Sequence, residues 1–131
     1  MGELKGKVAI VTGAGRLRGI GRAAAVALAE MGADLIVTGT GRDPSTFPED
    51  EVAVGWKDIE SVAQQVQEAG GRALPVVGDI SDSGQARKIV DAAMTEFGRV
   101  DILINNAAFA KGPDRTPAAE MDEAIFRRVL E

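Results

Sequence analysis

Apolar runs of strand length alternate with stretches of helical spacing along this chain. The apolar runs predict four buried strands, at residues 8–11, 35–37, 73–77 and 100–104. Helical spacing between the runs predicts helices over residues 20–31, 59–69 and 86–97. Gly32, Gly70 and Gly98 follow these helices as stop signals. Thr116 and Pro117 then predict the start of a last helix that runs to Leu130.

Strands and helices that alternate with short connections are typical of right-handed βαβ units. We therefore predict an α/β protein with a Rossmann-type doubly wound parallel sheet in three α/β/α layers. The sheet is expected to be incomplete, with about four strands in the order 3-2-1-4. Residues 43–55 are the one stretch predicted to be irregular. In that order the fourth strand would form an uncovered apolar edge.

Composition narrows the class of protein. The chain has 131 residues, of which 45% are hydrophobic and 27% charged, so one globular domain is expected. Its net charge of -5 gives no basic field for nucleic acid, and no apolar run is long enough to span a membrane. We expect a soluble, cytoplasmic protein. Cysteine and histidine are absent, which removes thiolate nucleophiles, triad bases and the commonest zinc ligand, and no metal site is predicted.

The turn between the first strand and the first helix is rich in glycine. It reads Thr-Gly-Ala-Gly-Arg-Leu-Arg-Gly-Ile-Gly from Thr12 to Gly21. At such a junction, backbone N–H groups and the helix N-terminus favour binding of a pyrophosphate. A side chain at Gly13 or Gly19 would block its approach. The predicted phosphate-binding residues are Gly13, Gly15, Arg16, Arg18, Gly19, Ile20 and Gly21.

This turn, Asp79 and the run from Asn105 to Ala108 resemble the N-terminal half of the classical short-chain dehydrogenase/reductase family. The resemblance covers essentially the whole chain. It implies that Asp79 and Ile80 lie at the adenine, and that Asn105, Asn106, Ala107 and Ala108 line the nicotinamide ribose. Two departures stand out: five residues separate Gly13 from Gly19 where the family has three, and Ala108 replaces a usual glycine. Asp79 could alternatively belong to a helix cap, a role that Ser81 or Asp82 could also fill.

Cofactor choice should show after the second strand, where an acid would bond the hydroxyls of an NAD ribose. The sequence there is Thr38-Gly39-Thr40-Gly41-Arg42, so no carboxylate is expected to repel a 2′-phosphate. Thr40 and Arg42, with the loop arginines, could instead bind that phosphate. We therefore predict that NADP(H) is preferred and that NAD(H) is possible, with Asp43 able to reverse the preference.

The resemblance implies hydride transfer between nicotinamide and a small-molecule carbonyl or alcohol, with a tyrosine and a lysine moving the proton. This chain contains no tyrosine, so we assign no catalytic residue and predict that it is inactive alone. Residues 1–131 are interpreted as an NAD(P)-binding domain truncated before the catalytic half. The complete protein would be a homo-oligomer, a dimer or tetramer. A non-catalytic nucleotide-binding or scaffold module that pairs with another chain is the alternative, and a methyltransferase is a weaker one.

Overall fold

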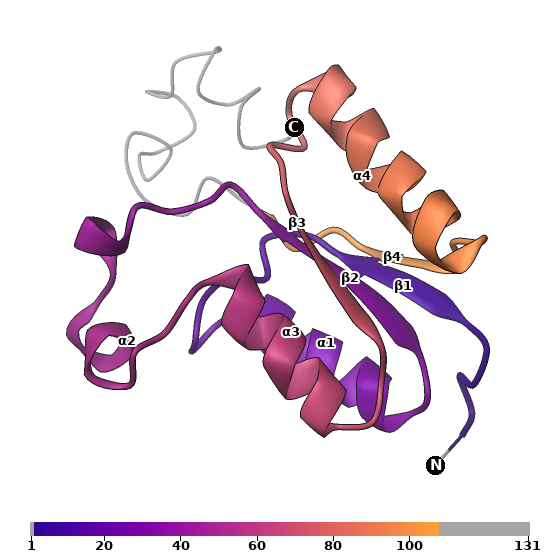
Figure 1. Ribbon diagram of the computed structural model, residues 1–131, viewed down its shortest axis with the longest axis horizontal. Helices are drawn as coiled ribbons and strands as arrows, with labels where there is room; N and C mark the ends of the chain where they lie inside the picture. Colours follow the sequence, from indigo (N-terminus) through magenta and orange to yellow (C-terminus); the bar gives the residue numbers. More distant parts are fainter. Residues whose placement is uncertain (1, 108–131) are drawn as a thin grey trace, which may run out of the picture.

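The computed structural model describes residues 2–107, which form one parallel sheet with helices on both faces (Figure 1). The strands are β1 (Val8–Val11), β2 (Asp34–Gly39), β3 (Ala73–Val77) and β4 (Ile102–Ile104). The helices are α1 (Ile20–Glu30), α2 (Glu49–Ala53), α3 (Ile59–Glu68) and α4 (Ser83–Phe97), with a short 3-10 turn η1 at Pro44–Thr46.

The strand order is β3-β2-β1-β4, which confirms the order predicted from the sequence. All pairs are parallel, with Ile10 opposite Ile36 on one side and Leu103 on the other. The carboxyl ends of parallel strands meet at one edge of the sheet. The glycine-rich turn after β1, the segment after β2 and the asparagines after β4 therefore come together at that edge.

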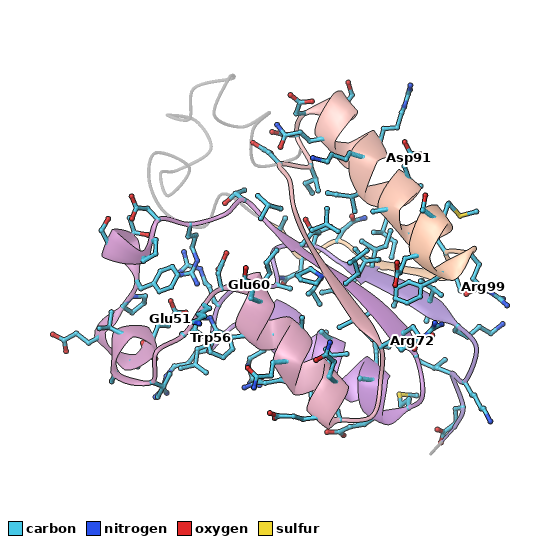
Figure 2. All side chains as sticks on the ribbon, in the orientation of Figure 1. Glu51, Trp56, Glu60, Arg72, Asp91 and Arg99 are labelled. Atoms are coloured by element: carbon cyan, nitrogen blue, oxygen red, sulfur yellow. The ribbon has the colours of Figure 1, made fainter. Side chains whose placement is uncertain are left out.

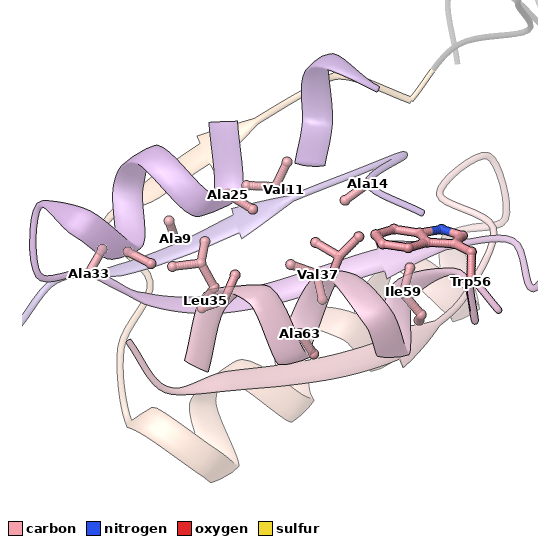
Figure 3. Packing of buried hydrophobic residues seen from close by; sticks show 13 residues of the cluster. Ala9, Val11, Ala14, Ala25, Ala33, Leu35, Val37, Trp56, Ile59 and Ala63 are labelled. Carbon is pink, nitrogen blue, oxygen red and sulfur yellow. The ribbon is translucent and has the colours of Figure 1, made fainter. Parts of the chain in front are cut away.

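Helices α1 and α3 cover one face of the sheet and α4 covers the other (Figure 1). Because strand side chains alternate between faces, Leu35 and Val37 pack with α1 and α3, whereas Ile36 packs with α4. Fully buried Ala25 lets α1 lie close to the sheet. The larger cluster ends at Trp56, whose indole lies beside the carboxyl edge (Figure 3).

The structure differs from the sequence-based prediction at two places. Residues 43–55, predicted to be irregular, contain η1 and the single-turn helix α2. Helix α4 begins three residues before its predicted start because Asp82 caps it, accepting hydrogen bonds from the N–H groups of Gly84 (2.9 Å) and Gln85 (3.1 Å). The predicted last helix lies outside the described residues. Across residues 2–107, no helix combines the length and apolar character needed to cross a bilayer.

Candidate dinucleotide site at the carboxyl edge of the sheet

The N-terminus of α1 opens at the carboxyl edge without a side-chain cap. Gly19 is its N-cap residue, with extended backbone, and no acidic residue stands in the first turn. The N–H of Ala23 bonds the carbonyl of Gly19, so the N–H groups of Ile20, Gly21 and Arg22 lack an intrahelical acceptor. Together with the positive end of the helix dipole, these donors can hold a phosphate group. Ile20 is 79% exposed, which leaves the helix end accessible.

The turn before α1 is fastened to the end of β4. The hydroxyl of Thr12 accepts hydrogen bonds from the N–H groups of Asn106 and Ala107, both at 3.1 Å. The Asn106 amide donates to the carbonyl of Gly13 at 3.0 Å. Asn106 and Ala107, which were predicted from the resemblance, therefore lie against the glycine turn.

A side chain would meet different neighbours at each glycine of the turn. Gly13 has a φ of +63°, and a Cβ there would stand 2.7 Å from the Cα of Ala107. A Cβ on Gly21 would stand 2.7 Å from the Asn106 amide nitrogen. Gly19 has only Arg16 nearby, at 3.3 Å. The missing side chain of Gly13 therefore makes room for the backbone after β4, whereas the three atoms nearest to a Cβ on Gly19 all belong to Arg16.

The segment after β2 holds the lengthened turn at Gly15 and Leu17. The N–H of Leu17 donates to Oε2 of Glu51 at 2.9 Å. The indole N–H of Trp56 donates to the carbonyl of Gly15 at 2.6 Å. Glu51 and Trp56, which are labelled in Figure 2, both bond the glycine turn from this segment. The lengthened turn therefore has its own support.

Arg42 lies at the centre of this support. Its Nη1 is 3.0 Å from Oε1 of Glu51, its Nη2 is 2.9 Å from Oδ1 of Asp58, and Nη2 also donates to the carbonyl of Gly15 at 3.2 Å. The guanidinium carbon stands 4.6 Å from the centre of the Phe47 ring. Burial lowers the pKa of Arg42, but hydrogen bonds and charge from Glu51 and Asp58 outweigh it and leave the pKa raised.

These contacts correct one premise of the predicted NADP(H) preference. The prediction considered only the residues directly after the second strand, Thr38 to Arg42 and Asp43, yet the carboxylates of Glu51 and Asp58 reach Arg42 from later in the chain. Arg18 pairs with Asp50 at 2.5 Å. Arg16 is exposed on the turn. The Asp43 carboxylate accepts a hydrogen bond from the N–H of Ser45, which lowers the pKa of Asp43, so Asp43 is occupied in capping η1.

The other predicted residues lie at the same edge with varied surroundings. Asp79 Oδ1 accepts hydrogen bonds from the N–H (2.9 Å) and the hydroxyl (2.7 Å) of Ser81. Asp79 thus shapes the turn before α4, while Asp82 is the cap. Ile80 packs beside the α4 cluster, and Thr40 and Asn105 are exposed. Ala108 lies outside the described residues.

Sequence reasoning did not identify Glu51, Trp56 or Asp58. All three lie between β2 and the first turn of α3, in a stretch without strand or helix periodicity. The available signal was compositional. Trp56 is the single tryptophan of the chain, and Glu51 is the last of three consecutive acidic residues. A lone tryptophan in a polar stretch marks a segment that packs rather than an unsupported loop.

The parallel sheet, the glycine turn and the exposed helix end define an α/β domain of the dinucleotide-binding class. The family model for short chain dehydrogenases matches residues 7–131. The chain belongs to the short-chain dehydrogenase family. This family assignment confirms the resemblance.

Individual relatives agree with this assignment. An uncharacterized oxidoreductase of Methylorubrum extorquens is 36% identical over 131 residues, which are 100% of this chain and 46% of the relative. The cis-4-hydroxycyclohexanecarboxylate dehydrogenase of Sinomonas cyclohexanicum is 39% identical over 125 residues, or 95% and 43% of the two chains. A short chain dehydrogenase from Mycobacterium paratuberculosis bound to NAD superposes with a TM-score of 0.73 at 32% identity, covering 98% of this chain and 45% of that one. The chain thus spans less than half the length of these relatives.

Proposed function

We propose that this chain is the cofactor-binding part of an NAD(P)(H)-dependent oxidoreductase that transfers hydride between nicotinamide and a carbonyl or alcohol substrate. The observation that carries the proposal is the uncapped N-terminus of α1, which lies at the carboxyl edge beside the end of β4. Its unpaired N–H groups fit the pyrophosphate of a dinucleotide. The bound nicotinamide would supply or accept the hydride.

In this proposal, different described residues contact different parts of the cofactor. The N–H groups of Ile20 and Gly21 hold the pyrophosphate, and Gly19 leaves room for it. Asp79 and Ile80 lie at the adenine. Asn105, Asn106 and Ala107 lie under the nicotinamide ribose, with Asn106 also fixing the glycine turn. Proton transfer needs groups other than a tyrosine of this chain, which has none.

The substrate class follows from a relative. The Sinomonas protein is named for a secondary alcohol on a six-membered ring, so a cyclic secondary alcohol or its ketone is the first substrate to try with the whole protein. We further propose that residues 1–131 form one NAD(P)-binding domain and that the whole protein is a cytoplasmic homo-oligomer. The negative net charge favours a small-molecule substrate over nucleic acid.

NADP(H), which the sequence predicts to be preferred, is one of two candidates for the cofactor, the other being NAD(H). The observation that favours it is Arg16, an exposed arginine on the glycine turn, whose guanidinium could pair with a 2′-phosphate. Arg18 and Arg42 add less to this candidate because each already contacts a carboxylate.

A substitution at the helix end tests the proposal. Ile20→Asp places a negative charge at the first turn of α1, which suits the helix dipole and maintains the fold. The same carboxylate competes with pyrophosphate for the unpaired N–H groups. Calorimetric titration of the 131-residue chain should show one site for NADH, and we expect Ile20→Asp to weaken it by about tenfold or more.

Ile20→Asn is the matched control because it changes the shape similarly without the charge. We expect it to retain most of the affinity. Absence of binding of both NADH and NADPH to the unmodified chain would overturn the proposal, as would equal affinities of the aspartate and asparagine variants. The unmodified chain is also expected to bind reduced cofactor without oxidising it when cyclohexanone is added.

A further inference from the structure

Asp58 lies where the acid missing after β2 would be expected. Residue 39, at the end of β2, is a glycine and offers no carboxylate. A Cβ built on Gly39 would be 3.8 Å from Oδ2 of Asp58, and a Cβ built on Gly15 would be 2.1 Å from Oδ1. The Asp58 carboxylate therefore stands between the glycine turn and the end of β2, although it comes from the start of α3, 19 residues after Gly39 in the sequence.

The backbone of Asp58 is held in a costly conformation. With φ +57° and ψ -134°, it is the one residue other than glycine with positive φ among the described residues. Such a conformation is energetically unfavourable for a residue with a side chain and persists where surrounding contacts impose it. Asp58 also occupies the N-cap position of α3, yet its side chain makes no capping hydrogen bond. Helix capping therefore does not explain its residue type.

Arg42 orients the carboxylate and leaves one oxygen available. Both Nε (3.0 Å) and Nη2 (2.9 Å) of Arg42 contact Oδ1 of Asp58. Within residues 2–107, no donor forms a hydrogen bond to Oδ2. The side chain of Asp58 keeps 11% of its surface exposed. An oriented carboxylate with an unused oxygen at this edge can accept hydrogen bonds from vicinal hydroxyl groups.

The charge of the cluster disfavours a further phosphate. Arg42 contributes one positive charge and Glu51 and Asp58 contribute two negative charges, which leaves the group net negative. To bind a 2′-phosphate, Arg42 would have to leave two carboxylates that are 3% and 11% exposed. Leaving such carboxylates unpaired is costly.

We propose that Asp58 accepts hydrogen bonds from the hydroxyls of the adenosine ribose, and that the chain thereby selects NAD(H) over NADP(H). The inference rests on the proposed function, because it assigns one end of the same dinucleotide. A carboxylate that bonds the 2′-hydroxyl repels a phosphate at that position. Asp58 thus substitutes in space for an acid that the sequence lacks after the second strand.

The test compares the dissociation constants of NADH and NADPH for the 131-residue chain and for Asp58→Asn. Asparagine tolerates positive φ and keeps the size of the side chain while removing its charge. In the unmodified chain we expect NADH to bind about tenfold or more tighter than NADPH. Asp58→Asn should weaken NADH by about tenfold and bring the ratio of the two constants close to one.

Glu60→Gln is the matched control, because Glu60 is an exposed acid in the first turn of α3, two residues from Asp58. It should keep the ratio of the unmodified chain. Circular dichroism checks that each variant folds, and Asp58→Gly serves as a second variant that removes the carboxylate and relieves the positive φ.

The outcomes separate the two proposals. Binding of NADPH as tight as or tighter than NADH to the unmodified chain would overturn the role of Asp58 while leaving dinucleotide binding intact. An unchanged ratio in both Asp58 variants would do the same. Failure of both dinucleotides to bind the unmodified chain would overturn the proposed function itself.

Discussion

At the scale of single residues, the glycine turn shows how a close approach of backbone can require glycine. Gly13 and Gly55 have nearly the same φ, +63° and +68°, but only Gly13 is crowded. A Cβ on Gly13 would meet the Ala107 backbone, whereas one on Gly55 would have nothing within 4 Å. The pair therefore separates the cost of positive φ from the cost of a steric clash.

We predict that Gly13→Ala lowers the free energy of unfolding by about 2–4 kcal/mol, and Gly55→Ala by about 1 kcal/mol. Both variants carry the cost of an alanine at positive φ, and the first also displaces the chain after β4. Urea unfolding monitored by circular dichroism measures both. Equal losses would show that Ala107 does not approach Gly13 in solution.

A second prediction compares the effect on stability of removing Arg42 with that of removing Arg72, an arginine with similar contacts. Each arginine pairs with a carboxylate and lies over a phenylalanine ring, Phe47 for Arg42 and Phe97 for Arg72. The Arg42 side chain is 15% exposed and that of Arg72 is 67% exposed. We expect Arg42→Ala to cost about 3 kcal/mol of unfolding free energy because it leaves Glu51 and Asp58 unpaired.

Arg72→Ala should cost much less unfolding free energy than Arg42→Ala, because the Arg72–Asp34 pair lies at the surface, where water screens it. The same unfolding experiment measures both variants. A loss for Arg42→Ala no larger than that for Arg72→Ala would contradict a buried, structural role for the Arg42 cluster.

Residue identities at the site were partly predictable from the sequence. The family motifs in the sequence identified Gly13, Gly21 and Asn106. These residues meet at the carboxyl edge, where the strand ends of a parallel sheet come together. Arg42 was identified, but its partners were not. The Asp58 carboxylate reaches the site from another element through a strained backbone, and no spacing rule in the sequence encodes that approach.

At the scale of elements, β4 is joined to β1 by a side chain as well as by backbone. The N–H of Val8 donates to Oδ2 of Asp101 at 2.9 Å, and the N–H of Asp101 returns a bond of the same length to the Val8 carbonyl. Arg99 contacts both carboxylate oxygens of Asp101, at 2.8 and 2.7 Å. The hydrogen bond from Arg99, followed by the one from Val8, lowers the pKa of Asp101 below its ordinary value of 3.8.

This lowered pKa predicts the pH dependence of stability. The contribution of Asp101 is fully present above its unfolded pKa of 3.8 and is lost as the pH falls through the lower folded pKa. Asp101→Asn cannot titrate, so its unfolding free energy should fall less steeply below that pH than that of the unmodified chain. Unfolding in urea at a series of pH values measures the two slopes. Identical slopes would contradict the lowered pKa.

The elements themselves were largely predictable, because strand and helix periodicities alternate along the chain. The strand order and all four strands were confirmed, and α1 and α3 end within one residue of their predicted ends. The stretch from η1 to α2 was missed, since helices of three and five residues are too short to show a period. Side-chain contacts from Glu51 and Trp56, rather than helix propensity, fix this stretch in place.

At the scale of the whole molecule, the sheet directs three separate segments to one edge. The glycine turn, the stretch from Arg42 to Asp58 and the end of β4 surround the N-terminus of α1. The outer strand β4 is less covered: its Leu103 is 54% exposed within the described part of the chain. The parallel sheet thus brings together, at its carboxyl edge, all the segments that the proposed function uses.

Backbone amide NMR of the isotope-labelled chain during titration with NADH tests the central claim most directly, because each amide reports its own surroundings. We predict the largest shifts at Gly19, Ile20 and Gly21, with smaller shifts at Asn106 and Asp58, and little change at the far ends of α1 and α3. Saturable shifts confined to other surfaces, or no shifts at all, would contradict a dinucleotide site at the N-terminus of α1.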